Sequence, residues 1–403
     1  MSYRASVRFI VITTLLVWAT AVELPAAAGS LVTVDHERRY TRAEVDRYAD
    51  RLFNQQSTPS ARYDVDVFRM ELYSTDLEGE DTVVTTQLFV PRLGSVGATR
   101  RGPLYVFAAG TTGLTDACRT SREYEAGVNW GLYRHHMLAH AGQGSIGVLP
   151  DYMHFGDPDR LQPYFIAEAG GRILLDSIRA VLAYLDSPAS EVRIRPAGTF
   201  LAGFSQGGHA AFAAADIRDD YAPEVELSGI IGYGPTTSIE DVFREFSVVA
   251  PAIIYTYAEH YGRDRFDPAE MLADRWLDSL ERDVTRQCIL GYQSYYPWGP
   301  HTLFRPEFTS ALVNRRLESE YPEIYAVLAE QQTGLTGHGV PAFILQGTND
   351  VVIDEGDQTR FVTALRERGS NVRYRLFQNS PHDTRQIGFF EVVNWMREQA
   401  QRN

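Results

Sequence analysis

The pentapeptide at residues 203–207 reads Gly-Phe-Ser-Gln-Gly, and its serine has the surroundings of a nucleophile. An apolar run at residues 199–202 precedes it, and an Ala- and Gly-rich segment at residues 208–213 follows. This order predicts a strand, a sharp turn and a helix, and small flanking residues permit the strained backbone that holds a serine hydroxyl clear of a sheet edge. The context favours a nucleophilic Ser205 over an ordinary glycine-rich turn.

The C-terminal part of the chain contains candidates for a base and an acid. A serine hydroxyl is a poor nucleophile at neutral pH, and a histidine oriented by a carboxylate usually removes its proton. The apolar run at residues 343–347 predicts a buried strand that leads to Asp350, and the strand predicted at 374–377 is followed by His382. We therefore expect Asp350 and His382 to meet Ser205 at one edge of the sheet.

Two other carboxylates compete with Asp350 for the role of the acid. Asp354 and Asp357 lie a few residues further along the same segment. Asp350 is favoured because it comes first after its strand, although it could merely cap a turn.

Acyl transfer at a serine produces an oxyanion, which backbone N–H groups can stabilise. The N–H of Gln206 is one candidate, because it lies at a helix N-terminus, where the helix dipole favours negative charge. The second donor should come from the loop at residues 108–114, whose glycines permit exposed amides. Thr111 is our choice there and Thr112 is second, while a purely structural glycine-rich turn is the alternative.

Other polar clusters do not indicate a metal or a cofactor. His136 and His140 are spaced as a metal-binding pair on a helix, but such pairs are more often packed or solvated. The acidic loop at residues 151–159 lacks the glycine and the distant glutamate of a calcium-binding hand. We expect neither a metal ion nor a cofactor.

The N-terminal 28 residues differ from the rest of the chain. Arg4 and Arg8 precede an apolar run at residues 9–22, and small residues lead up to Ala28. This pattern predicts a secretory signal peptide, cleaved after Ala28. The apolar run is shorter than the roughly 20 residues that span a bilayer, so a stable membrane anchor is not expected, although an uncleaved N-terminal anchor is the alternative.

Charge and cysteine content agree with an exported enzyme. The 403-residue chain has a formal charge of −14 and no Lys/Arg-rich run, which argues against nucleic acid or an anionic membrane as its main partner. It has two cysteines, Cys118 and Cys288. In an exported protein an isolated pair is more often a disulfide than two free thiols, so we expect them to be bonded.

The order of predicted elements indicates an α/β fold. Alternating patterns at residues 63–70 and 82–90 predict half-exposed antiparallel strands. Short apolar strands and helices then alternate, which predicts a mostly parallel sheet with helices on both faces. The strands are expected at 103–107, 145–149, 198–202, 227–232, 340–346 and 372–377, and the helices at 41–54, 124–140, 165–185, 207–217, 357–368 and 385–399.

One long interval, residues 235–339, interrupts this alternation. It has helical patterns and many aromatic residues, and it is far longer than an ordinary connection between strands. Its position would place it over the carboxyl ends of the strands, where such sheets bind ligands. We therefore expect a helical cap over a core made of residues 29–234 and 340–403, with a helical subdomain on one flank as the alternative.

Four separated segments together resemble the secretory lipase family of α/β-hydrolases. They are residues 110–118, residues 150–180, the serine turn at 203–208, and residues 347–352 with His382. The resemblance implies an α/β-hydrolase fold and ester hydrolysis through an acyl-serine intermediate, with the cap forming an acyl-binding tunnel. Ser205, Asp350 and His382 match the family's catalytic triad in chain order.

The chain departs from the family pattern at two places. Ala109 stands where the oxyanion loop often has a histidine, so we expect a different support for that loop. Met153 and His154 stand where the loop after Tyr152 often continues with Glu-Gly, so we expect the pocket rim and the choice of substrate to differ from the family pattern.

The sequence thus predicts a secreted serine hydrolase for carboxylic esters, such as acylglycerols or other lipid-like esters. We expect a small-molecule or lipid ester as its partner, with transient contact at a lipid interface and no nucleic acid. A serine peptidase or amidase on the same fold is the alternative, because a triad does not distinguish esters from amides. A non-catalytic binding protein is disfavoured because all three triad residues are present.

Overall fold

The computed structural model describes residues 27–54, 57–93, 100–124, 127–188, 190 and 192–401. The signal peptide expected at residues 1–28 therefore lies outside the described residues, apart from its last two positions. Among the described residues, no helix combines the length and the apolar character that a membrane crossing requires.

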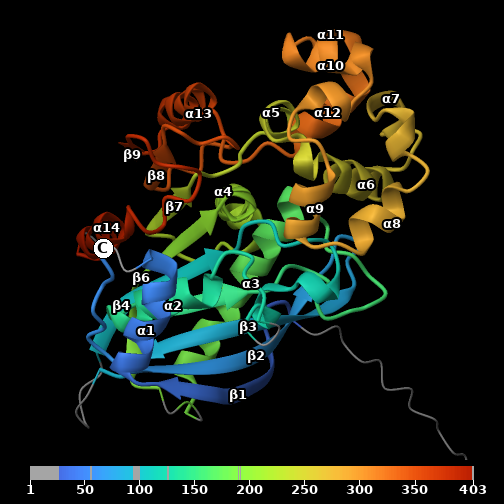
Figure 1. Ribbon diagram of the computed structural model, residues 1–403. Helices are drawn as coiled ribbons and strands as arrows, with labels where there is room; N and C mark the ends of the chain where they lie inside the picture. The colour runs from blue at the N-terminus through green and yellow to red at the C-terminus, as the bar shows by residue number, and fades with distance from the viewer. Residues whose placement is uncertain are drawn as a thin grey trace, which may run out of the picture.

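A nine-stranded sheet runs through the described part of the chain, in the order β1-β2-β3-β5-β4-β6-β7-β8-β9 (Figure 1). The pairs from β1 to β5 in this order are antiparallel, and all pairs from β5 to β9 are parallel. The strands are β1 (Leu31–Tyr40), β2 (Val65–Thr75), β3 (Asp81–Pro91), β4 (Arg100–Ala108), β5 (Ile146–Pro150), β6 (Ile194–Phe204), β7 (Gly229–Tyr233), β8 (Ala342–Gly347) and β9 (Val372–Phe377). The predicted mostly parallel sheet is confirmed.

Helices cover both faces of the sheet, because the central strands are apolar on both sides. In β4, Leu104 and Val106 belong to one buried cluster, while Tyr105 and Phe107 belong to a second cluster. The first cluster contains residues of α3 (Ala167–Asp186), α4 (Gln206–Tyr221) and α13 (Glu355–Glu367). The second contains residues of α1 (Arg42–Phe53), α2 (Tyr133–Gly142) and α14 (Phe389–Ala400). Alternate side chains of one strand thus anchor the two helical layers.

The structure contains one strand that was not predicted, and two of its helices begin later than expected. Strand β1 was not predicted, because its sequence is mostly polar and it lies at the sheet edge with much of its length exposed. The helix expected at 385–399 begins only at Phe389, and the helix expected at 124–140 begins only at Tyr133. The backbone N–H groups of residues 130–133 instead bind the carboxylate of Glu123, which holds this segment as a loop before the helix.

The long interval between β7 and β8 is helical in the structure. Figure 1 shows these helices gathered beyond α4 at the end of the molecule away from β1. They are α5 (Ile239–Glu245), α6 (Ala250–Tyr261), α7 (Pro268–Met271), α8 (Leu280–Thr285), α9 (Ile289–Tyr295), α10 (Pro306–Val313), α11 (Leu317–Glu320) and α12 (Pro322–Glu330). Many of the aromatic residues here pack in the interior, among them Phe243, Tyr257 and Tyr292.

The histidines of α2 pack among aromatic side chains of the core. His136 Nε2 lies 2.8 Å from the hydroxyl of Tyr105, and the ring of His140 stacks on Tyr105 with centroids 4.1 Å apart. His135 lies against Tyr48, with ring centroids 5.1 Å apart. The pair His136 and His140 therefore takes part in core packing.

These buried histidines should make the protein sensitive to acid. Burial lowers the pKa of His140 to about 3 and, together with nearby arginines, that of His135 to about 4. In the unfolded chain both titrate near 6.5, so from that pH down to about 3 for His140 and about 4 for His135 only the unfolded state binds the proton. The free energy of unfolding should therefore fall as the pH falls, by about 1.4 kcal/mol per pH unit for each histidine.

Urea unfolding of a His140→Phe variant at pH 7 and at pH 4.5 tests this expectation. Phenylalanine can stack on Tyr105 but cannot bind a proton, so the variant should lose less stability between the two pH values than the unmodified protein. Substitution of the exposed His301 by alanine should leave the loss unchanged. An equal loss in His140→Phe and in the unmodified protein would contradict the expectation.

Candidate active site

Ser205 lies on a tight turn between β6 and α4. Its φ of 54° and ψ of −115° place it in a region that non-glycine residues rarely adopt. A Cβ at Gly203 would collide with the carbonyl oxygen of Gly207, and a Cβ at Gly207 would collide with that of Ala108. The two glycines thus allow the strand, the turn and the neighbouring strand β4 to approach closely, with a strained serine at the apex.

Asp350 and His382 form a hydrogen-bonded pair on the loops after β8 and β9. His382 Nδ1 lies 2.8 Å from Asp350 Oδ2. The other carboxylate oxygen of Asp350 accepts hydrogen bonds from the N–H groups of Val352 and Ile353, at 2.8 and 2.9 Å. Asp350 also accepts a hydrogen bond from Gln346 Nε2 at 3.0 Å. These contacts fix the carboxylate, which in turn fixes the imidazole.

The environment of Asp350 keeps its carboxylate ionised. Burial alone raises its pKa, but the charge and hydrogen bond of His382 and the two backbone N–H groups lower the pKa by more. The result is a pKa below the ordinary value of 3.8. At neutral pH this carboxylate is negative and can stabilise a protonated His382.

Ser205 and His382 line the same cavity of about 110 Å³. The structure forms no hydrogen bond between them, and His382 Nε2 is buried without a hydrogen-bond partner in the described part of the chain. Catalytic hydrogen bonds are often long before substrate binds, and an unpartnered Nε2 can accept a proton. The rest of the cavity lining is mostly apolar and consists of Thr111, Trp130, Tyr133, Phe165, Phe204, Thr236, Val242, Phe246, Val249, Ile289, Gln293 and Val352.

The two expected oxyanion donors lie where the sequence placed them, at the start of α4 and on the loop after β4. Gln206 is the first residue of α4, and its side chain donates to Gln162 Oε1 at 3.2 Å. Thr111 lines the cavity, and its hydroxyl lies 2.7 Å from that of Tyr164. Thr112 is not among the lining residues. A role for the Gln206 and Thr111 amides remains a prediction.

In the loop after β4, Ala109 stands at the position expected for a histidine, and side chains from another segment support the loop instead. The hydroxyl of Tyr152 donates to the carbonyl of Ala109 at 2.6 Å. Gln162 Nε2 also donates to the carbonyl of Gly113. The segment after β5 therefore holds this loop at two points.

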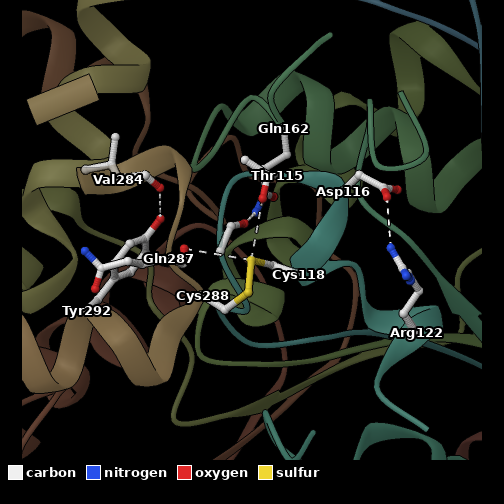
Figure 2. Close-up of a disulfide and its surroundings, with 10 residues drawn as sticks. Thr115, Asp116, Cys118, Arg122, Gln162, Val284, Gln287, Cys288 and Tyr292 are labelled. Carbon is white, nitrogen blue, oxygen red and sulfur yellow. Dashed lines mark hydrogen bonds and ion pairs between the residues drawn. A yellow bond between two sulfur atoms is a disulfide. The ribbon is translucent and has the colours of Figure 1, made fainter. Parts of the chain in front are cut away.

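The predicted disulfide between Cys118 and Cys288 is present (Figure 2). Next to it, the N–H of Ile289 donates to the carbonyl of Thr112 at 2.7 Å, and Gly113 forms a β-bridge with Cys288. Cys288 directly precedes α9, which contributes Ile289 and Gln293 to the cavity. The disulfide therefore ties the loop that carries Thr111 to a helix from the interval between β7 and β8.

The rival carboxylates have other partners. Asp354 caps the N-terminus of α13 by accepting the N–H groups of Gly356 and Asp357. Asp357 is buried and accepts hydrogen bonds from Arg244 and Arg315, at 2.9 and 2.7 Å. Within the described part of the chain, neither forms a hydrogen bond or ion pair with His382, which supports the choice of Asp350.

Sequence reasoning missed most of the cavity wall. Trp130 and Tyr133 belong to the segment whose N–H groups bind the carboxylate of Glu123, and Phe165 lies just before α3. An aromatic residue in a loop carries no sequence signal for the direction of its side chain. Glu123 and Arg385 were also missed, because charged residues are usually exposed and nothing in their local pattern marks them as buried.

Comparisons with known proteins show which family and which structures this chain is similar to. The family model described as secretory lipase matches residues 135–399. A lipase A of Moesziomyces aphidis is 23% identical over 257 residues, which are 62% of this chain and 54% of that protein. The chain thus spans about half the length of this curated relative.

Solved structures show the same fold. A ligand-bound form of the rice cell wall degrading esterase LipA from Xanthomonas oryzae is 19% identical with a TM-score of 0.71, covering 93% of this chain and 98% of that one. Lipase A of Candida antarctica is 18% identical with a TM-score of 0.66, covering 93% and 82% of the two chains. These likenesses confirm the predicted α/β-hydrolase fold.

Proposed function

Because this chain belongs to the secretory lipase family, we propose that it hydrolyses carboxylic esters through an acyl-serine intermediate at Ser205. The observation that carries the proposal is the meeting of a strained Ser205 and the Asp350–His382 pair at one apolar cavity. Such a set of residues supplies a nucleophile, a base and a group that orients the base.

The first half of the proposed reaction forms the acyl-enzyme. Ser205 Oγ attacks the carbonyl carbon of the ester while His382 Nε2 takes the hydroxyl proton. Asp350 stabilises the imidazolium that results. The backbone N–H groups of Gln206 and Thr111 would bind the oxyanion, a contribution of about 3 kcal/mol per donor in comparable sites. The intermediate then collapses, and the proton on His382 passes to the departing alcohol.

The second half releases the acid and restores the enzyme. A water molecule gives a proton to His382 Nε2 as its oxygen attacks the acyl carbon. The second oxyanion collapses by breaking the bond to Ser205 Oγ, which recovers the proton from His382. The overall reaction consumes one ester and one water and yields one acid and one alcohol.

The lining and the volume of the cavity also indicate which acyl groups would fit it. Its described lining has no carboxylate, arginine or lysine, so an uncharged acyl chain suits it better than a charged one. Its volume of about 110 Å³ is smaller than the roughly 150 Å³ of a cavity that holds benzene. We therefore propose that short acyl chains are preferred, with the helices between β7 and β8 acting as a cap that limits chain length.

A hydrolysis panel tests the proposed function. It would compare p-nitrophenyl esters from acetate to palmitate with aminoacyl p-nitroanilides. We expect turnover of the esters, with kcat/KM highest for short acyl chains, and little turnover of the amides. Turnover of the amides without the esters would support a peptidase or amidase and overturn the proposal.

The family and the disulfide indicate an extracellular protein. Cleavage after Ala28 is part of our proposal. N-terminal sequencing of the exported protein should then begin at Gly29, and a sequence beginning at Met1 would contradict cleavage.

A further inference from the structure

Arg385 is a buried cation on the loop between His382 and α14. Its side chain is only 1% exposed, although it carries a full positive charge. Asp383 neutralises it through two hydrogen bonds, from Nε to Oδ1 at 2.9 Å and from Nη2 to Oδ2 at 2.6 Å. The N–H of Arg385 also donates to Asp383 Oδ1 at 3.1 Å, so the segment directly after His382 is fixed by three contacts.

The same guanidinium reaches the turn that carries the nucleophile. Its central carbon lies 4.8 Å from the ring centroid of Phe204, the residue before Ser205. The ring of Phe204 in turn lies 4.8 Å from the ring of His382. Phe204, which directly precedes Ser205, therefore contacts both the guanidinium of Arg385 and the imidazole of His382.

A third contact joins Arg385 to the cavity wall. Nη2 donates to the carbonyl of Gly131 at 2.7 Å, and the guanidinium lies 5.0 Å from the ring centroid of Tyr133. Glu123 holds this wall from the other side, because its carboxylate accepts the N–H groups of all four residues from 130 to 133. Arg385 thus connects three parts of the site: the loop after His382, the turn before Ser205, and the cavity wall that contains Trp130 and Tyr133.

Stability is a poor explanation for this arrangement. A buried ion pair must recover a large desolvation cost, and replacement of both partners by uncharged residues is often neutral or stabilising. Removal of one partner alone is strongly destabilising, because it leaves an unpaired buried charge. The planar guanidinium nevertheless has several donors in a fixed geometry, which suits it to hold several loops in register.

We propose that Arg385 is a positioning residue, which holds His382 in register with Ser205 and with the Trp130–Tyr133 wall. This inference rests on the proposed function, because it assigns Arg385 a part in the chemistry of that site. It acts through Asp383, Phe204 and Gly131, and it need not touch the substrate.

The test uses a paired variant, Asp383→Asn with Arg385→Met, which removes both partners of the ion pair together. Asparagine can still accept the N–H of residue 385, so we expect the variant to fold. A shift of about 1 Å in a catalytic group can lower the rate about 100-fold, so we expect kcat for a short-chain ester to fall about 100-fold, with a smaller change in KM. Arg385→Lys keeps the charge but cannot form the two parallel hydrogen bonds to Asp383. Its kcat should therefore lie between that of the paired variant and that of the unmodified protein.

A matched control removes another partly buried ion pair, Asp176→Asn with Arg179→Met on α3. Asp176 is fully buried and lies 3.0 Å from Arg179, and neither residue lines the cavity. This control should alter stability without altering kcat. A folded Asp383→Asn/Arg385→Met variant with the kcat of the unmodified protein would overturn the proposal.

A second measurement does not depend on turnover. The Nδ1–H of His382, bonded to Asp350, should give a downfield proton NMR signal, assigned by its absence in His382→Gln. We expect this signal to weaken or vanish in the paired variant and to persist in the control. A persistent signal in the paired variant would overturn the positioning role. If the unmodified protein hydrolyses no ester, the proposed function fails, and this signal still decides whether Arg385 positions His382.

Discussion

Replacing Ser205 by alanine should lower kcat for ester hydrolysis by about a million-fold, the loss seen when a triad serine is removed from a comparable hydrolase. The variant lacks the oxygen that forms the acyl-enzyme, while alanine fits the same turn with one atom fewer. KM should change little, because the apolar cavity lining remains. Steady-state kinetics with a short-chain p-nitrophenyl ester would measure the effect.

A matched control for this prediction is another hydroxyl of the same cavity. Thr236 lines the cavity beside Ser205, and valine has nearly the same shape without the hydroxyl. Thr236→Val should retain most of the activity. Substantial ester turnover by a purified Ser205→Ala variant would show that the chemistry takes place elsewhere.

Replacing Asp350 by asparagine should lower kcat by about ten thousand-fold. The carboxylate of Asp350 accepts a hydrogen bond from the Nδ1–H of His382 and so keeps Nε2 free to act as the base. An amide can instead donate to Nδ1, which favours the tautomer with its proton on Nε2. The imidazolium formed during catalysis would also lose its counter-charge. The measurement is kcat for a short-chain ester, together with thermal unfolding to show that the variant is folded.

Asp354→Asn is the matched control for Asp350→Asn. Both changes remove one carboxylate from the segment between β8 and α13, but asparagine caps a helix as well as aspartate does, so Asp354→Asn should be neutral. If Asp354→Asn or Asp357→Asn abolished activity while Asp350→Asn did not, the acid would be wrongly assigned.

The sequence predicts the central part of this fold because local and long-range forces agree there. Strands β5, β7 and β8 and the C-terminal halves of β4 and β6 are apolar runs, because helices cover both of their faces. Strand β1 has no such signal, since its charged residues remain exposed at the edge of the sheet. Its pairing with β2 is a tertiary contact that periodicity does not reveal.

The predicted site residues share a feature that the other residues around the cavity lack. Ser205, Asp350 and His382 each follow a predicted strand directly, so the topology alone brings them to one edge of the sheet. The late start of α2 depends instead on the carboxylate of Glu123, which binds amides seven to ten residues further along the chain. Asp383 lies only two residues from Arg385, but the other contacts of the buried guanidinium are with Phe204 and Gly131, about 180 and 250 positions away, which no local pattern reveals.

The most direct measurement of the central claim is the reaction of the unmodified protein with a fluorophosphonate, followed by mass spectrometry of its peptides. A serine activated by His382 and facing an oxyanion site should bond to the phosphorus and expel fluoride. We predict one adduct per chain, on Ser205, and none in His382→Gln over the same time. A folded protein that remains unlabelled, or an adduct on another residue, would contradict the assignment of Ser205 as the nucleophile.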